Sequence, residues 1–154
     1  MQVNRLMRAE VITVLPEEPL STAVRLMWDR DLGALPVVQG TDRRPIAMIT
    51  DRDICMAAWS RGRALDELRV SDAMSPKILT CSHKNSVSTA EAYMRANKVR
   101  RIPIVDDAGQ LIGILALADL AKSAGKPMFR DEPELSLEQF AFTINAICEP
   151  NPAK

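Results

Sequence analysis

The side chains best suited to binding a ligand lie in the segment Thr50-Asp-Arg-Asp53. This segment follows a short apolar strand and opens a predicted helix, so free backbone N–H groups and the positive end of the helix dipole point outward. A phosphate would fit there, because the Thr50 hydroxyl and Arg52 can donate hydrogen bonds to it. Asp53 could accept hydrogen bonds from the hydroxyls of a ribose. Thr50 and Asp53 also have the spacing of a capping box, which only stabilises the helix by about 1 kcal/mol. The spacing alone leaves both interpretations open.

A related segment, Ala116-Leu-Ala-Asp119, occurs in the second half of the chain. It keeps the aspartate but lacks the hydroxyl. Arg100 and Arg101 stand directly before a predicted strand in the same half, where they would suit either a phosphate or a solvated charge pair on a strand edge. The sequence therefore predicts two unequal sites, and we expect binding to depend more on Asp53 than on Asp119.

These two segments belong to a duplication that covers most of the 154 residues. Val11-Ile-Thr-Val14 matches Ile78-Leu-Thr-Cys81, and Leu35-Pro-Val-Val38 matches Ile102-Pro-Ile-Val105 at the same offset. After the first hairpin the offset falls by one, so that Asp53 matches Asp119. Each half is too small to bury its apolar face alone. We therefore expect two similar clefts where the halves meet, and we expect function there.

Each repeat is predicted to run strand, helix, strand, strand, helix, which makes the chain an α+β protein. In the first repeat we predict a strand at 11–14, a helix from Leu20, strands at 35–38 and 46–49, and a helix at 51–60. In the second we predict a strand at 78–81, a helix at 87–96, a hairpin turning at 106–109 and a helix at 117–123. The predicted organisation is a first repeat at 1–66, a second repeat at 67–126 and a tail at 127–154.

The tail carries one further predicted helix, which lies outside the duplication. Ser136 is suited to cap its N-terminus, with Gln139 three residues later, and an apolar stripe from Leu137 to Ile147 ends before Pro150. Such a helix either packs on its own domain or forms an interface with a partner. The sequence leaves both possibilities open.

Composition limits the classes of function. The chain is 47% hydrophobic, and its 20 basic and 20 acidic residues cancel, so no overall positive field would recruit nucleic acid or an anionic membrane. The three cysteines are odd in number and form no C-x-x-C pair, which favours free thiols in a reducing cytoplasm. The longest apolar run, 111–118, is far shorter than the roughly 20 residues of a membrane helix, and no signal peptide is recognised. We expect a cytoplasmic protein.

No pattern in the chain favours catalysis. His83 is the single histidine, and it lies in a predicted loop without a neighbouring carboxylate, so we expect no metal site there. No nucleophile elbow, Walker A loop or glycine-rich dinucleotide motif occurs. We expect a protein that is not an enzyme and that requires no cofactor.

The order of these motifs resembles that of a CBS domain. The first half carries Val11-Ile-Thr-Val14, a helix, Ala34-Leu-Pro-Val-Val38 and then Ile46-Ala-Met-Ile-Thr-Asp-Arg-Asp-Ile54. Two such units resemble the CBS pair called a Bateman module over about residues 4 to 125, including the lead-in Val70-Ser-Asp-Ala-Met74. The resemblance implies two tandem CBS repeats, packed as a pseudo-two-fold pair. It also implies a regulatory sensor that binds AMP, ADP, ATP, S-adenosylmethionine or a related nucleotide between the repeats.

The resemblance also implies roles for particular residues. Thr50-x-x-Asp53 would be the ribose and phosphate motif, and Arg100 and Arg101 would bind phosphates. By position, Ile12 and Gly33 would line the cleft that holds Asp119. Leu79 and Val99 would line the cleft that holds Asp53. Met48 and Ile114 would lie beneath the sugar. The alternative for these apolar residues is simple core packing. The family usually has glycine at the place of Ala47, as at Gly113, so the extra methyl group would narrow one cleft.

The sequence thus predicts a ligand-sensing module in which an adenosine nucleotide is a regulatory ligand. The alternative is a structural interaction module that has degenerate clefts and docks a partner protein. The family resemblance further implies a homodimer formed through helices, for which we expect Met27, Trp28, Tyr93 and Met94 to be exposed. A regulated partner protein would fit this scheme, whereas nucleic acid and membrane are not expected partners.

Overall fold

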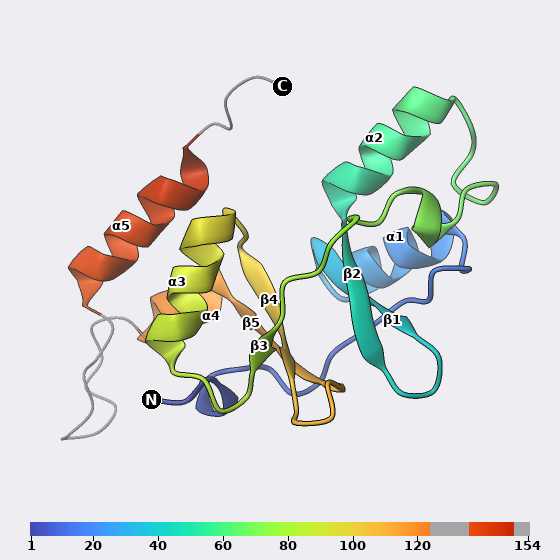
Figure 1. The fold of residues 1–154 in the computed structure, drawn as a ribbon. Helices are drawn as coiled ribbons and strands as arrows, with labels where there is room; N and C mark the ends of the chain where they lie inside the picture. The colour runs from blue at the N-terminus through green and yellow to red at the C-terminus, as the bar shows by residue number, and fades with distance from the viewer. Residues whose placement is uncertain (124–135, 150–154) are drawn as a thin grey trace. The chain divides into compact units, whose positions relative to one another are not determined.

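The structure is a computed structural model that describes residues 1–123 and 136–149. Figure 1 shows helices gathered around short strands, in agreement with the predicted α+β class. In chain order the elements are η1 (Val3–Arg5), α1 (Leu20–Asp29), β1 (Ala34–Gln39), β2 (Arg44–Thr50), α2 (Asp51–Arg61), η2 (Val70–Asp72), β3 (Cys81–Ser82), α3 (Val87–Asn97), β4 (Arg101–Val105), β5 (Leu111–Ala116), α4 (Leu117–Ser123) and α5 (Leu137–Cys148).

The chain forms two compact units. Each unit contains the elements of one repeat together with the segment that precedes the other repeat. The α1–α2 unit consists of Glu10–Leu79 and Gly109–Leu111, and the α3–α5 unit consists of Met1–Ala9, Thr80–Ala108 and the described residues from Ile112 onward. The first nine residues therefore pack with elements of the second repeat. In that unit Arg8 and Ile114 exchange backbone hydrogen bonds of 2.9 and 3.0 Å. The predicted repeat boundaries at 66 and 126 are a different division of the chain and stay a prediction.

The α1–α2 unit is built on an antiparallel hairpin of β1 and β2, with an irregularity between Val37 and Val38. Gly40 adopts a left-handed φ of 63° in the turn that connects the two strands. Five consecutive residues of β1, Ala34–Val38, are buried. The apolar face of α1 covers this strand, which produces one core. Its buried members are Val14, Leu20, Ala23, Met27, Leu35, Val37, Ala47, Ile49, Ile54, Ala57, Leu68 and Val70.

The predicted opening strands are much shorter than expected. In the run 11–14 only Val14 pairs, as an isolated parallel bridge to Val37, and the run 78–81 contributes only Cys81 to β3. The cause lies in the partner strand. A parallel ladder extended backward from Val14 would need a backbone N–H at position 36, which is proline and has none. Pro103 stands at the matching place beside β3, so the same interruption occurs in both repeats.

The α3–α5 unit contains a three-stranded sheet in the order β3-β4-β5. Both predicted helices of the second repeat are present, and α4 has the predicted bounds. The tail helix α5 begins at the predicted cap, where Ser136 and Gln139 form a capping box. Figure 1 shows α5 lying alongside α3, and contacts between these two helices confirm the packing. Of the two possibilities for the tail, packing on its own domain is the one the structure shows.

Candidate ligand-binding site

The motif Thr50–Asp53 forms the junction between β2 and α2. Thr50 is extended, with φ −116° and ψ 162°, and caps the helix. Its backbone N–H donates to Asp53 Oδ2 over 2.9 Å, its hydroxyl lies 2.6 Å from the same oxygen, and the Asp53 N–H donates to Thr50 Oγ1 over 3.1 Å. The capping box foreseen as one interpretation is therefore present.

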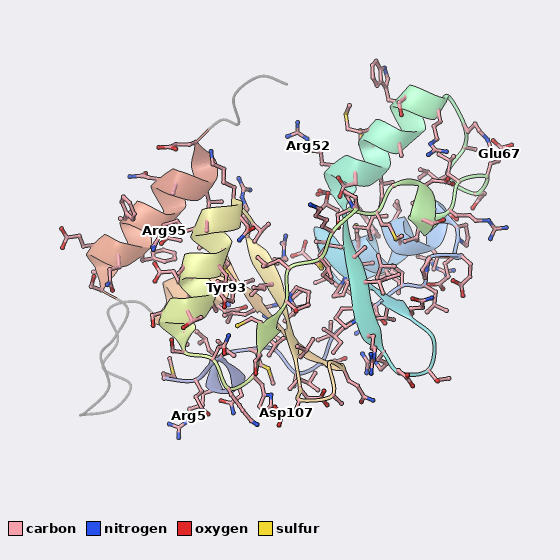
Figure 2. All side chains as sticks on the ribbon, in the orientation of Figure 1. Arg5, Arg52, Glu67, Tyr93, Arg95 and Asp107 are labelled. Carbon is pink, nitrogen blue, oxygen red and sulfur yellow. The ribbon has the colours of Figure 1, made fainter. Side chains whose placement is uncertain are left out.

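This capping box leaves half of the Asp53 carboxylate available. All of its hydrogen bonds use Oδ2, and among the residues of the α1–α2 unit no donor pairs with Oδ1. Asp53 is partly buried, and Arg52 beside it is exposed and extends away from α2 (Figure 2). Helix capping and acceptance of a ribose hydroxyl are thus compatible, because they use different oxygens. The Thr50 hydroxyl, in contrast, would have to turn away from Asp53 before it could donate to a phosphate.

Ser75 lies next to this junction and was not foreseen from the sequence. Its N–H donates to the Met48 carbonyl over 2.8 Å, and its hydroxyl accepts from the Met48 N–H over 3.0 Å. The same hydroxyl donates to the Lys77 carbonyl over 3.0 Å. A short side chain is therefore held beside β2 and does not pair with Asp53.

The matching junction of the second repeat, between β5 and α4, differs at one oxygen. The Ala116 N–H donates to Asp119 Oδ2 over 3.0 Å, which repeats the backbone half of the capping box. Asp119 Oδ1 accepts from both Nε and Nη2 of Arg8, each over 3.1 Å. The Asp119 side chain is 8% exposed and that of Arg8 is 54% exposed. Asp119 is therefore buried beneath a guanidinium that reaches it from the solvent side.

Arg8 was also missed by the motif analysis, although a signal for it existed. The offset that places Met7 on Met74 places Arg8 on Ser75. The structure agrees, because the Arg8 N–H donates to the Ile114 carbonyl as the Ser75 N–H donates to the matching Met48 carbonyl. Arginine and serine share no chemistry, so matching by residue type passes over this position.

The remaining predicted site residues divide between the two units. Gly33 precedes β1 in the chain, and its carbonyl accepts a hydrogen bond from the N–H of Asp51, the first residue of α2. Correspondingly, the Arg100 carbonyl accepts from the N–H of Leu117, the first residue of α4. The Arg100 side chain is exposed, whereas Arg101, Val99 and Ile114 are partly buried.

Core packing explains part of the predicted apolar lining. Ile12 packs against the core of the α1–α2 unit, and Leu79 is partly buried in the same unit. The predicted linings combine Ile12 and Gly33 with Asp119, and Val99 with Asp53, and these residues belong to different units. The lining assignments therefore stay predictions.

Two titratable groups of the α3–α5 unit have shifted pKa values. Burial raises the pKa of the Cys81 thiol, and a hydrogen bond from Lys84 together with its charge lowers the pKa of the Asp107 carboxyl. Among residues 1–123 and 136–149, no three metal-ligating side chains come together. Within the same ranges, no helix is both long and apolar enough to cross a bilayer.

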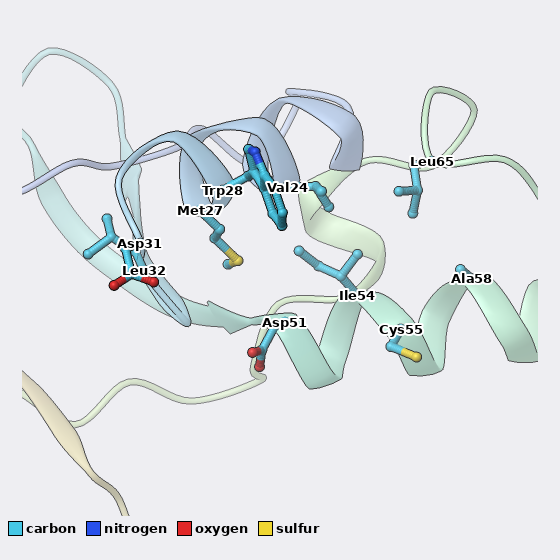
Figure 3. Close-up of a pocket in the computed structure, with 10 residues that line it drawn as sticks. All are labelled: Val24, Met27, Trp28, Asp31, Leu32, Asp51, Ile54, Cys55, Ala58 and Leu65. Carbon is cyan, nitrogen blue, oxygen red and sulfur yellow. The ribbon is translucent and has the colours of Figure 1, made fainter.

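A groove of about 670 Å³ runs between α1 and α2 (Figure 3). Trp28, at its edge, is 84% exposed, and Tyr93 on α3 is 40% exposed, as predicted for a helical interaction face. The prediction was wrong for Met27 and Met94, which are 6% and 0% exposed, because successive helical positions turn by about 100° and these two point into the core. The groove is lined by Val24, Met27, Trp28, Asp31, Leu32, Asp51, Ile54, Cys55, Ala58 and Leu65.

Comparison with known proteins relates this architecture to one family. The model of the CBS domain matches the chain twice, at residues 3–60 and 70–126. The CBS domain-containing protein YhcV of Bacillus subtilis is 38% identical over 120 residues, which are 77% of this chain and 82% of YhcV. The uncharacterised protein MK0525 of Methanopyrus kandleri is 35% identical over 118 residues, and the match spans 77% of this chain and 60% of that longer protein.

A solved structure has the same fold. The CBS domain pair of protein MJ0100, in complex with 5-methylthioadenosine and S-adenosyl-L-methionine, matches with a TM-score of 0.70 at 19% identity. The match covers 79% of this chain and 98% of that one. At this identity the likeness concerns the fold.

Proposed function

Because this chain belongs to the CBS-domain family and carries two CBS domains, we propose that it is a regulatory module that binds an adenosine-containing nucleotide. The class includes AMP, ADP, ATP and S-adenosylmethionine. The observation that carries the proposal is Asp53 Oδ1, which accepts no hydrogen bond within the α1–α2 unit and is positioned at a strand-to-helix junction by hydrogen bonds to the other carboxylate oxygen.

The junction supplies the elements that a nucleotide needs. A ribose hydroxyl would donate to Asp53 Oδ1, and the start of α2 together with the exposed Arg52 would attract a phosphate or a carboxylate. The complex of MJ0100 with two adenosine compounds supports the ligand class, since it has the same fold. Leu79 would contact the base, and Met48 would lie beneath the sugar; both residues belong to the α1–α2 unit, as Asp53 does.

Regulation would follow from differential binding. A nucleotide that binds one arrangement of the repeats more tightly than another shifts the equilibrium between them by that difference in affinity. The module itself would perform no chemistry, and a partner protein would respond to the arrangement. The free thiols of Cys55, Cys81 and Cys148 support a reducing, cytoplasmic location.

A thermal-shift panel of adenine nucleotides and S-adenosylmethionine tests the proposal. A ligand present at about 100 times its dissociation constant adds about 2.7 kcal/mol of stability, which corresponds to a rise in Tm of roughly 5 °C. Asp53→Ala should weaken binding by about 1–3 kcal/mol, because it removes the ribose acceptor. The absence of any shift at millimolar ligand would refute the proposal.

Asp53→Ala also removes half of a capping box, so a matched control is needed. Ser136→Ala removes the cap of α5 and should cost a similar amount of stability, about 1 kcal/mol, without changing the ligand-induced shift. Only a loss of ligand response confined to Asp53→Ala identifies Asp53 as a binding residue.

The second candidate function is a structural interaction module that docks a partner through its tail helix. Exposed apolar side chains on α5 favour it, since Leu137 is 66% and Phe142 64% exposed. This candidate predicts no response to any adenine compound. The thermal-shift panel therefore separates the two functions.

We also propose that the chain forms a homodimer through the groove between α1 and α2. The groove is mostly apolar, and Trp28, which lines it, is 84% exposed. In the second repeat, the face of α3 that matches α1 is already covered by α5. A two-fold contact between two copies of the groove would bury the exposed tryptophan of each.

Light scattering tests this dimer. The proposal predicts about twice 17.0 kDa for the intact chain and a monomer for Trp28→Glu. Leu137→Glu places the same charge on α5 and should leave the dimer intact. A monomer at tens of micromolar intact protein refutes the dimer, and a loss of dimer with Leu137→Glu would assign the interface to the tail.

A further inference from the structure

The two repeats present the same carboxylate in two different states of pairing. In each repeat the aspartate uses Oδ2 to accept a backbone N–H three residues earlier. In the α1–α2 unit the second oxygen, Asp53 Oδ1, has no donor within that unit. In the α3–α5 unit the second oxygen, Asp119 Oδ1, accepts two hydrogen bonds from Arg8. The oxygen that would receive a ribose hydroxyl in the first repeat is therefore occupied by a guanidinium in the second.

Backbone hydrogen bonds hold Arg8 in the position from which it pairs with Asp119. Arg8 and Ile114 exchange two backbone hydrogen bonds, so the Arg8 Cα is held beside β5. Gly113 next to Ile114 lets this segment approach closely, since a Cβ there would overlap the Met7 side chain and lie 3.2 Å from the Arg8 carbonyl oxygen. From this anchored position the guanidinium contacts Asp119 with Nε and Nη2 together. Ser75 donates its backbone N–H to Met48 beside β2, and its hydroxyl is bonded to Met48 and Lys77 and not to Asp53.

We propose that Arg8 closes the ribose position at Asp119, so that each chain binds a single adenosine ligand, at Asp53. This inference rests on the proposed function and deepens it, because it sets the number of ligands per chain and names the residue responsible. A ribose hydroxyl is neutral, and it competes poorly with a guanidinium that makes two charge-assisted hydrogen bonds to a buried carboxylate. The unequal sites predicted from the lost hydroxyl at Ala116 thus have a second and stronger cause.

The pairing also predicts which ligands could reopen the second position. Arg8 leaves Asp119 at least cost when another anion replaces the carboxylate, and a phosphate chain supplies one. Adenosine carries no anionic group and would leave Arg8 on Asp119, whereas the phosphates of AMP and ATP and the carboxylate of S-adenosylmethionine can pair with Arg8 in its place. A second, weaker ligand is therefore expected only with anionic adenosine compounds at high concentration.

Isothermal titration calorimetry with AMP, ATP and S-adenosylmethionine tests the proposal through stoichiometry. The intact chain should bind one equivalent of tight ligand. Arg8→Ser installs the residue that stands at the matching place beside β2, Ser75, and it should raise the stoichiometry to two. Asp53→Asn combined with Arg8→Ser should bind one equivalent, at Asp119. Arg44→Ser removes an exposed arginine from β2 and should leave the stoichiometry at one.

The possible outcomes distinguish closure of the second position by Arg8 from nucleotide binding at Asp53. Two tight equivalents on the intact chain, one of them lost in Asp119→Asn, would overturn the inference and leave the proposed function standing. One equivalent on the intact chain that stays at one in both Arg8→Ser and Arg8→Gln would also overturn it, and the second variant guards against a folding defect in the first. One equivalent on Arg8→Ser with none on the intact chain would support the closure but refute binding at Asp53. No binding to either protein would overturn both.

Discussion

The tail helix α5 is held on α3 by a buried polar contact whose removal has a calculable cost. Thr143 is 0% exposed, and its hydroxyl donates to Glu91 Oε1, whose side chain is 5% exposed. Arg95 Nη1 donates to the same threonine oxygen over 3.2 Å and lies 3.9 Å from the Glu91 carboxylate. Thr143→Val keeps the shape of the side chain but leaves Glu91, among the described residues, with only the long contact to Arg95.

A buried charged group that loses its hydrogen bond costs about 2–3 kcal/mol. For a chain of this size each kcal/mol lowers Tm by about 2–4 °C, so Thr143→Val should lower Tm by roughly 4–12 °C. Thr143→Ser keeps the hydroxyl and should cost about half as much or less. Urea unfolding measures the free energies, and hydrogen exchange of the α5 amides shows whether the loss is local to this helix.

A double-mutant cycle completes this test. Replacing both partners, in Glu91→Leu with Thr143→Val, leaves no unpaired carboxylate and should recover most of the stability lost in Thr143→Val. Equal stability of the valine and serine variants would show that the hydrogen bond contributes nothing. Strict additivity in the cycle would equally refute the reasoning, because it would mean that the two side chains do not interact.

Two further predictions concern close packing and thiol chemistry. Gly113→Ala should destabilise the protein by about 1–3 kcal/mol in urea unfolding, because the added methyl group meets Met7 and the Arg8 carbonyl; unchanged stability would show that this segment yields freely. Cys81 should react with iodoacetamide far more slowly than the two exposed cysteines at pH 8, since burial raises its thiol pKa and keeps it protonated. Mass spectrometry should then find two adducts on the native protein and three after unfolding, and three rapid adducts would contradict the buried position.

The helices could be predicted from the sequence because their signals are local. Apolar spacing and capping residues placed α4 at its observed bounds and α5 at its observed cap. The opening strands could not be predicted in the same way, because a β-branched run says nothing about the strand it must pair with. Val11–Val14 looks like a strand by itself, and only Pro36 on the partner explains why the ladder stops at Val14.

The candidate site shows the same limit more sharply. The Thr50–Asp53 junction was visible because its parts are three residues apart, and its two interpretations both fit the observed geometry. Arg8 and Asp119 are 111 residues apart, and their pairing depends on the first nine residues joining the second repeat. Only the repeat alignment, which places Arg8 on Ser75, points to the position at all.

Differences between matched positions indicate how the two repeats have diverged. The duplication places Glu91 on Val24 and Arg95 on Trp28. In the second repeat, Glu91 and Arg95 bind α5 of the same chain, whereas in the first repeat their counterparts line an apolar groove.

The matched residues Arg8 and Ser75 show the same contrast between the two units. In the α3–α5 unit Arg8 pairs with Asp119 and Arg95 lies near Glu91, while the α1–α2 unit leaves a carboxylate oxygen and an apolar face available. If this division is correct, exchanging Val24 and Trp28 for glutamate and arginine should abolish the dimer and leave nucleotide binding at Asp53 unchanged. Light scattering and calorimetry on one variant measure both properties, and a simultaneous loss of binding in a folded protein would show that the groove and the ligand site are one functional surface.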